Sequence, residues 1–182
     1  MSCGYKWLCG PYGTGFAWMT PALRERLCYE QAYWLNGVDP GALESLAAVE
    51  DHGVPGYDVF CPASFLNSRP WLAALDVLLD AGIERIAVHD QDLVGRLLDG
   101  LGPERWELVS PAAPPARSTL VLFRPRGDEL AGDVRARLSA TGVDVAERNG
   151  CVRISPHAHN TVEDIDRALD VLDCRAPSDR RS

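Results

Sequence analysis

The chain has 182 residues, a length typical of one globular domain with a sizeable core. Hydrophobic residues make up 46% and charged residues 24%, a globular rather than a disordered or fibrous composition. The net charge is −8, which excludes a basic nucleic-acid-binding surface as the main feature. Of the 18 basic residues, 17 are arginines, and Lys6 is the single lysine. No apolar run reaches the roughly 18 residues of a membrane span, and no signal peptide opens the chain. We therefore expect a cytoplasmic protein without nucleic-acid or membrane partners.

Cysteine and histidine spacing gives no metal motif. No two cysteines form a CxxC pair, which argues against a zinc ribbon or a thioredoxin-like site. His157 and His159 have the spacing to face one way on a strand, but no cysteine or carboxylate completes a ligand set. We expect no metal site, and free thiols that are mostly buried.

The first part of the chain is rich in turn signals. Five of the twelve residues 4–15 are Gly or Pro, which predicts a structured loop. Residues 15–20 are typical of a strand, and residues 20–27 of a short helix with Thr20 as its N-cap. Leucine and valine spacing indicates a further helix over 39–53.

Helical periodicity is strong from Trp71 onward. Residues 71–82 predict an apolar helix that ends at Gly82, a C′ glycine. Residues 83–102 continue as an amphipathic helix. Its expected buried stripe consists of Ile86, Leu93, Leu97, Leu98 and Leu101.

The last part alternates strands and helices. Residues 118–125 predict a strand, and residues 128–142 an amphipathic helix stopped by Gly142. Residues 143–157 predict a hairpin around Asn149-Gly150, a strong turn signal.

A C-terminal helix is expected over 161–172, with Thr161 and Asp164 in an approximate capping box. Residues 101–175 therefore predict strand, strand, helix, strand, strand, helix, a compact α+β domain with an antiparallel sheet. Residues 176–182 form a polar tail.

Lys6 is the residue with the clearest chemical potential. It lies between two aromatic residues, ahead of Gly10, Gly13 and Gly15, which would allow the backbone to approach a phosphate. A desolvated lysine amine reacts with carbonyls. On spacing alone, a solvated surface lysine explains the pattern as well.

Three segments together resemble one family. The segment GYKWLCGPYGTGF (4–16) resembles the cofactor-lysine segment of class V aminotransferases, which are pyridoxal-phosphate enzymes of fold type I. VRISPHAHNTVEDIDRALDVL (152–172) resembles their C-terminal signature. YDVFCPASFLN (57–67), followed by 72–86, resembles more weakly the segment that leads into the helix joining their two domains.

This resemblance implies a partial fold: α/β with an α+β C-terminal domain. Residues 1–70 would be the tail of the large cofactor domain, 71–100 the connecting helices, and 101–175 the complete small domain. The implied cofactor is pyridoxal 5′-phosphate and the implied substrate an amino acid. Lys6 matches the lysine that forms the internal aldimine and shuttles the α-proton. Arg153 matches the arginine that binds the substrate carboxylate, for which a planar guanidinium is suited.

Further site residues follow from the same resemblance. Ser64 lies near the position of a phosphate-binding hydroxyl directed to the neighbouring subunit, with Asn67 as a nearby alternative and a candidate substrate contact. Tyr5, Tyr12 and Thr14 could face the cofactor or simply pack. His157 could lie behind the substrate site or serve only as a structural hydrogen-bonding residue.

This sequence departs from the family's usual motifs at two places, and both indicate which branch of the family it resembles. The string Cys3-Gly4-Tyr5-Lys6 replaces the common Ser-Gly-His-Lys, and it looks like the isopenicillin-N-epimerase-like branch. Cysteine desulfurases carry their nucleophile about fifteen residues before the arginine, yet 134–148 contains no cysteine, and Cys151 is only two residues before Arg153. Desulfurase chemistry is therefore disfavoured.

In the family's enzymes, the lysine that Lys6 matches lies past the middle of the chain, whereas Lys6 lies near the start of this sequence. The aspartate for the pyridine nitrogen, the ring-stacking residue and most of the parallel sheet are then expected to come from elsewhere. Leu8, Phe16, Trp18 and parts of 71–81 would expose apolar surface. We expect a homodimer or pairing with a separate N-terminal half. The alternatives are a non-catalytic remnant that binds a partner protein or nothing, and a protein using Lys6 only to bind carbonyls or phosphates.

Overall fold

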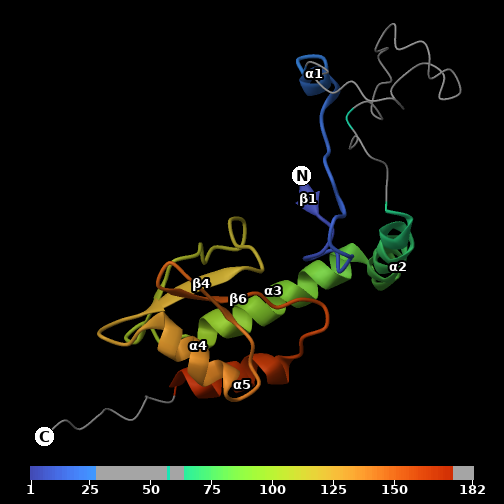
Figure 1. Ribbon diagram of the computed structural model, residues 1–182. Coiled ribbons are helices and arrows are strands. Elements are labelled where there is room, and N and C mark those ends of the chain that lie inside the picture. The colour runs from blue at the N-terminus through green and yellow to red at the C-terminus, as the bar shows by residue number, and fades with distance from the viewer. Residues whose placement is uncertain (28–56, 58–63, 174–182) are drawn as a thin grey trace, which may run out of the picture. The chain divides into compact units, whose positions relative to one another are not determined.

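A computed structural model of the chain describes residues 1–27, 57 and 64–173 (Figure 1). The chain divides into two compact units, Met1–Asp80 and Ala81–Ser182. Within the described ranges, no helix is long and apolar enough to cross a membrane. The helix expected over 39–53 lies outside the described residues.

The first unit contains a short hairpin near the N-terminus. Strand β1 (Ser2–Cys3) pairs antiparallel with β2 (Gly15–Phe16), so that Cys3 lies opposite Gly15. The intervening residues form the loop predicted from their glycine and proline content. The strand expected over 15–20 is therefore only two residues long, because β1 supplies no further pairing positions.

Two helices complete the described part of this unit. Helix α1 (Pro21–Arg24) has the predicted cap: the Thr20 hydroxyl accepts a hydrogen bond from Leu23 N at 3.2 Å. Helix α2 (Phe65–Ala81) starts six residues earlier than predicted and contains Pro70. Pro70 is the sixth residue of this helix and has no N–H to donate to Leu66 O, so one helical hydrogen bond is missing in the second turn. Gly82, with φ +86°, follows α2, as predicted for a C′ glycine.

The second unit is built on a four-stranded antiparallel sheet. Its strands are β3 (Trp106–Leu108), β4 (Val121–Pro125), β5 (Ala146–Arg148) and β6 (Cys151–Ile154), in the order β3-β4-β6-β5. The turn between β5 and β6 is Asn149-Gly150, and both residues have positive φ, as a two-residue hairpin of type I′ requires.

Three helices pack with this sheet around one core (Figure 1). They are α3 (Ile83–Gly100), α4 (Ala131–Ser139) and α5 (Val162–Asp173). The core comprises Leu93, Val94 and Leu97 of α3, Trp106, Val121, Phe123, Val152 and Ile154 of the sheet, Ala131, Val134 and Leu138 of α4, and Ile165, Ala168 and Leu172 of α5. The sheet is antiparallel, as expected for residues 101–175, and the core also includes residues of α3, which lies before that range.

Several local expectations need correction. On α3, Ile86, Leu93 and Leu97 are buried as expected, whereas Leu98 and Leu101 are only half-buried. Val94, which lies between the stripe positions, is fully buried instead. Among the described cysteines only Cys151 is buried; Cys3 is half-buried and Cys9 is exposed, because the loop around Cys9 has little core to pack against.

Candidate functional site

The loop that carries Lys6 is closed by its own backbone. Gly4 N donates to Thr14 O at 2.7 Å, and Gly10 N donates to Gly4 O at 2.7 Å. Cys9 N donates to Lys6 O at 2.9 Å, so Lys6 lies in a tight turn between two crossings of the loop. The Lys6 side chain is exposed. The loop therefore fixes the backbone of Lys6 while it leaves the amine accessible.

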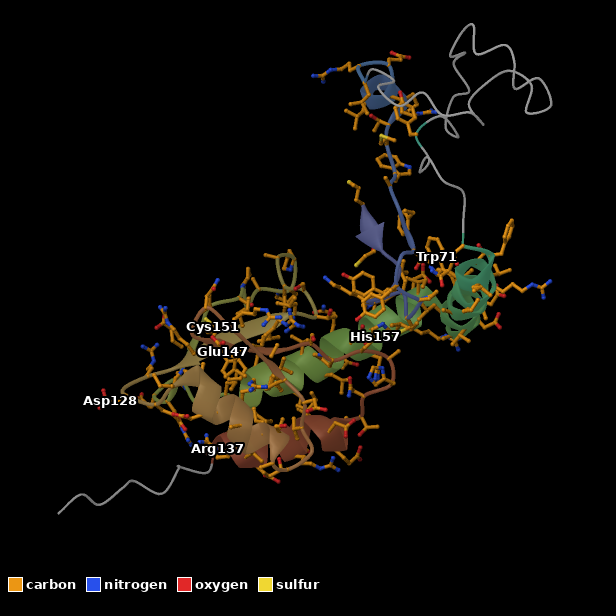
Figure 2. All side chains as sticks on the ribbon, viewed as in Figure 1. Trp71, Asp128, Arg137, Glu147, Cys151 and His157 are labelled. Carbon is orange, nitrogen blue, oxygen red and sulfur yellow. The ribbon has the colours of Figure 1, made fainter. Side chains whose placement is uncertain are left out.

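At two positions of this loop, glycine allows close packing that a side chain would prevent. A Cβ at Gly10 would lie 2.6 Å from Cδ1 of Trp71, a residue of α2 labelled in Figure 2. A Cβ at Gly15 would lie 2.8 Å from Ser2 O. Trp71 and β1 thus occupy the Cβ side of Gly10 and Gly15, and the expected close approach of a phosphate to these glycines stays a prediction. At Gly13 the nearest atom to an added Cβ is Asn67 Nδ2 at 3.4 Å.

Four of the predicted cofactor and substrate residues gather around Lys6 or its loop. The Tyr5 and Tyr12 rings stack with their centroids 4.5 Å apart, and Lys6 Nζ lies 5.6 Å from the Tyr5 centroid. Asn67 Nδ2 donates to Tyr12 O at 2.8 Å, which ties the start of α2 to the loop. The Thr14 hydroxyl donates to Pro11 O at 2.6 Å, so its hydrogen is engaged within the loop.

Ser64 directly precedes α2 and is exposed. Its carbonyl accepts from Asn67 N at 2.9 Å and from Ser68 N at 3.1 Å, which is the backbone pattern of a helix start. A hydroxyl at a helix N-terminus is a common partner of phosphate groups. Its surroundings thus fit the predicted phosphate contact, and the turn-forming role explains them as well.

Arg153 belongs to the second unit and lies on β6. It lines a cleft of about 510 Å³ together with Ser155, Pro156, His159, Asn160 and Asp164. Its register neighbours are Leu122 on β4 and Ala146 on β5, neither of which carries a charge. Within the described part of the chain, the buried Nε of Arg153 has no hydrogen-bond partner.

Other arginines of the same unit are paired with carboxylates. Arg96 contacts Asp166 through two hydrogen bonds of 2.5 and 2.7 Å, and Arg124 contacts Glu107 at 3.0 and 2.5 Å. Arg137, labelled in Figure 2, pairs with Glu129. Arg153 differs from these three because no carboxylate among the described residues pairs with it, and because it lines a cleft. A planar guanidinium of this kind is suited to a carboxylate.

Two acidic residues, Asp144 and Asp164, line the cleft, and Asp164 is engaged locally. Asp164 Oδ2 accepts from Thr161 N at 3.0 Å and from Asn160 Nδ2 at 3.4 Å. The Thr161 backbone N–H, then the Asn160 amide, hold the pKa of Asp164 below its ordinary value. Arg167 Nη1 lies 3.7 Å from Asp164 Oδ1. The negative charge of Asp164 is therefore stabilised by its own helix start and by Arg167.

The predicted residues thus form two groups, one in each unit. Lys6, Tyr5, Tyr12, Thr14 and Asn67 share the first unit, and Arg153 lies in the second. His157 N donates to Asn160 Oδ1 at 3.0 Å, which is a structural role within a turn. His159 stacks on His157 at 5.6 Å and lines the cleft. In the segments that the structure describes, no three His, Cys, Asp or Glu residues are arranged to hold a metal ion.

Two residues of the cleft region are missing from the sequence-based predictions. His89 Nε2 lies 2.9 Å from Asn160 O, a contact between residues 71 positions apart. Such a pair leaves no signal in one sequence, since no local spacing connects it. Asn160 directly precedes the predicted cap Thr161, and an asparagine at such a position commonly makes Asx-type hydrogen bonds to nearby backbone groups.

One curated relative matches almost the entire chain. Isopenicillin N epimerase from Streptomyces clavuligerus is 29% identical over 180 residues, which covers 93% of this chain and 45% of the epimerase. This chain therefore spans less than half the length of that relative. No family model matches the sequence.

Solved structures share the fold. A complex of the cystine C-S lyase C-DES with cysteine persulfide has a TM-score of 0.70 at 18% identity, covering 94% of this chain and 45% of the lyase. The apo cysteine desulfurase from Thermococcus onnurineus NA1 has a TM-score of 0.58 at 22% identity, covering 68% and 36%. A NifS-like protein has a TM-score of 0.52 at 18% identity, covering 62% and 33%.

These comparisons confirm the predicted resemblance to the C-terminal portion of class V aminotransferase-type proteins. They also confirm the fold class, part of a fold type I architecture with mixed α and β structure. The individual roles of Lys6 and Arg153 remain predictions.

Proposed function

We propose that this chain, which resembles the C-terminal portion of class V aminotransferase-type proteins, works as part of a pyridoxal-phosphate-dependent enzyme acting on an amino acid. The reaction would be of the aminotransferase, epimerase or lyase type. The observation that carries the proposal most is the match to isopenicillin N epimerase, which is 29% identical and extends over 93% of the chain. The cofactor, the substrate class and both residue roles are part of the proposal.

The residues around Lys6 fit a phosphorylated aldehyde by their chemistry. Lys6 offers an exposed primary amine on a loop that its backbone hydrogen bonds hold closed. The phenols of Tyr5 and Tyr12 and the hydroxyl of Ser64 supply donors of the kind that phosphate oxygens accept. Thr14 fits less well, because its hydroxyl already donates to Pro11 O. We therefore propose Lys6, Tyr5, Tyr12 and Ser64 as cofactor contacts, with Thr14 supporting the loop.

When bound, pyridoxal phosphate supplies an electron-withdrawing ring that stabilises negative charge at the substrate α-carbon. Lys6 Nζ would hold the cofactor covalently and then, once released, accept and return a proton at that carbon. The loop contacts Gly4–Thr14 and Gly10–Gly4 would keep the amine in one position during both tasks.

Arg153 would orient the substrate. Its guanidinium has a free Nε donor at the edge of a cleft, with uncharged register neighbours on both sides. A guanidinium binds a carboxylate through two parallel hydrogen bonds, which fixes the orientation of an amino acid. Asn67, the other predicted substrate contact, donates one amide hydrogen to Tyr12 O, and we assign its carbonyl oxygen and its second amide hydrogen to substrate.

A second polypeptide segment is part of this proposal. The chain covers only 45% of the epimerase, and its first unit exposes large apolar side chains, among them Phe16 at 54%, Trp18 at 74% and Leu72 at 60%. Leu8, which was expected to be exposed, is half-buried by its own loop. A homodimer or a separate N-terminal half would bury such a surface. The alternative, a non-catalytic subunit that binds a partner protein, rests on the same exposed residues.

The experiment is reductive trapping on Lys6. The purified chain is mixed with pyridoxal phosphate, reduced with borohydride and mapped by peptide mass spectrometry. Lys6 is the sole lysine, so the N-terminal amine is the only other primary amine. We expect the label on the Lys6 peptide at low cofactor excess, and a Lys6→Arg variant, which keeps the charge, to lose it. Equal labelling of Lys6 and the N-terminus would contradict a built cofactor site.

A further inference from the structure

We propose that His89 and Asn160 are positioning residues for the carboxylate site at Arg153. Together they hold residues 157–160, which follow Arg153 on the chain, in a fixed place beside its guanidinium. This inference rests on the proposed function of Arg153. It concerns only contacts within the second unit.

The first contact joins helix α3 to this segment. His89 is half-buried, and its Nε2 lies 2.9 Å from the backbone oxygen of Asn160. Because a carbonyl oxygen only accepts hydrogen bonds, Nε2 carries the hydrogen and donates it. The segment is thereby attached to the same helix that supplies Leu93, Val94 and Leu97 to the core. A buried core helix gives this contact a rigid base.

Asn160 then organises the segment itself. Its N–H donates to His157 O at 2.8 Å, and its Oδ1 accepts from His157 N at 3.0 Å. Its Nδ2 donates to Asp164 Oδ2 at 3.4 Å, beside the capping contact of Thr161 N to the same oxygen at 3.0 Å. One side chain therefore closes the turn at 157–160 and connects it to the start of α5.

This closed turn contributes two of the residues that line the Arg153 cleft. His159 and Asn160 both line it, together with Ser155 and Pro156, which connect the turn to β6. No strand or helix includes residues 155–161, so side-chain contacts such as these have to hold the segment. If the segment moves, the cleft is in its binding conformation for only a fraction of the time. The apparent affinity for a carboxylate is then the intrinsic affinity multiplied by that fraction.

A glutamine at position 89 provides a matched control. Its amide nitrogen reaches nearly the same place as Nε2 of histidine and can donate to Asn160 O. A leucine of similar volume cannot donate. Arg96→Met is a second control, because Arg96 also connects α3 to α5, through Asp166, but lines no part of the Arg153 cleft.

The test uses the full chain with two independent measurements. Backbone amide exchange is measured at His157, Asn160 and, as an internal reference for global opening, Phe123 in the core. Acetate is then titrated against the side-chain Nε–H resonances of ¹⁵N-labelled arginines, with chloride at equal ionic strength as the blank and Arg153→Lys to assign the signal.

For His89→Leu we expect faster exchange at His157 and Asn160, with exchange at Phe123 unchanged. Since one hydrogen bond is lost, we expect acetate binding at Arg153 to weaken about fivefold. His89→Gln should restore both, and Arg96→Met should change neither. Unchanged exchange at 157–160 in His89→Leu, or equal weakening in His89→Gln, would overturn the positioning role.

The proposed function fails by a different result. If acetate does not shift the Arg153 signal of the unaltered chain beyond the chloride blank, Arg153 is no carboxylate site, and the dependent role of His89 in binding is overturned with it. The exchange comparison still decides, by itself, whether His89 and Asn160 hold the segment.

Discussion

The two units of this chain use apolar residues in opposite ways. In the second unit, three helices and a sheet bury fourteen residues in one core, in which Phe123 packs edge-on against Trp106 with their centroids 5.3 Å apart. In the described residues of the first unit, Leu78 is the only large apolar residue classed as buried, while Tyr12, Phe16, Trp18 and Phe65 are exposed.

This difference teaches that apolar residues form a core only where secondary structure brings their side chains to one face. The second unit has alternating strands and amphipathic helices, which do this within about ninety residues. In the first unit, the aromatic residues that the structure describes lie on loops and on a helix with exposed residues around it. The second polypeptide segment that we propose would cover these exposed residues.

The largest expected difference is between the two units prepared as separate fragments. A chain that begins at Gly82 should keep the far-UV spectrum of the second unit and unfold cooperatively in urea, because none of its core residues comes from before residue 82. The complementary fragment 1–80 should show no cooperative transition. Broad, non-cooperative unfolding of the fragment from Gly82 would contradict the independence of the second unit.

A matched pair of phenylalanines sharpens the comparison. Phe123 is fully buried and Phe16 is 54% exposed. We expect Phe123→Ala to lower the free energy of unfolding by about 3–5 kcal/mol, because it leaves a cavity in the core. We expect Phe16→Ala to change it by less than about 0.5 kcal/mol. Urea denaturation of both variants measures the difference, and a comparable loss in Phe16→Ala would show that the first unit has a core of its own.

The second unit was predictable from sequence because its signals are local. Alternating and helical periodicity predicted its order of strands and helices, and Asn149-Gly150 predicted the turn, since few residues tolerate the positive φ values found there. The errors lie at the ends of elements. The strand expected from residue 118 begins only at Val121, because its pairing with β6 starts there.

In the candidate site, only the residues that belong to recognisable sequence motifs could be predicted. Lys6 and Arg153 emerged from strings that resemble a known family, and the structure places each of them on an accessible part of its unit. The close packing of Gly10 on Trp71 and the contact of His89 with Asn160 depend on residues more than fifty positions apart. No spacing rule within one sequence connects such pairs, so tertiary structure was needed to find them.

Two threonine caps of the same chemistry give a smaller test. Thr161 Oγ1 accepts from Asp164 N at 3.3 Å at the start of α5, and Thr20 Oγ1 accepts from Leu23 N at 3.2 Å at the start of α1. Thr161→Ala should lower the free energy of unfolding of the second unit by about 1 kcal/mol. Thr20→Ala should leave that transition unchanged, because α1 has only four residues and supplies none of that core. Equal shifts of the urea midpoint in both variants would mean that the units unfold together.

The smallest effect concerns a surface ion pair of the second unit. The hydrogen bond from Arg96 holds the pKa of Asp166 below its ordinary value, so the pair stabilises the fold when Asp166 is ionised. This contribution is fully present above the ordinary carboxyl pKa of about 4 and is lost as the pH falls through the lowered pKa. Both side chains are largely solvated, so we expect Asp166→Asn to shift the urea midpoint only slightly at neutral pH and not at all in strong acid. Asp170→Asn, a change at an exposed position on the same helix, is the control. A shift in Asp166→Asn as large as that in Phe123→Ala would mean that surface charge, rather than the apolar core, distinguishes the second unit from the first.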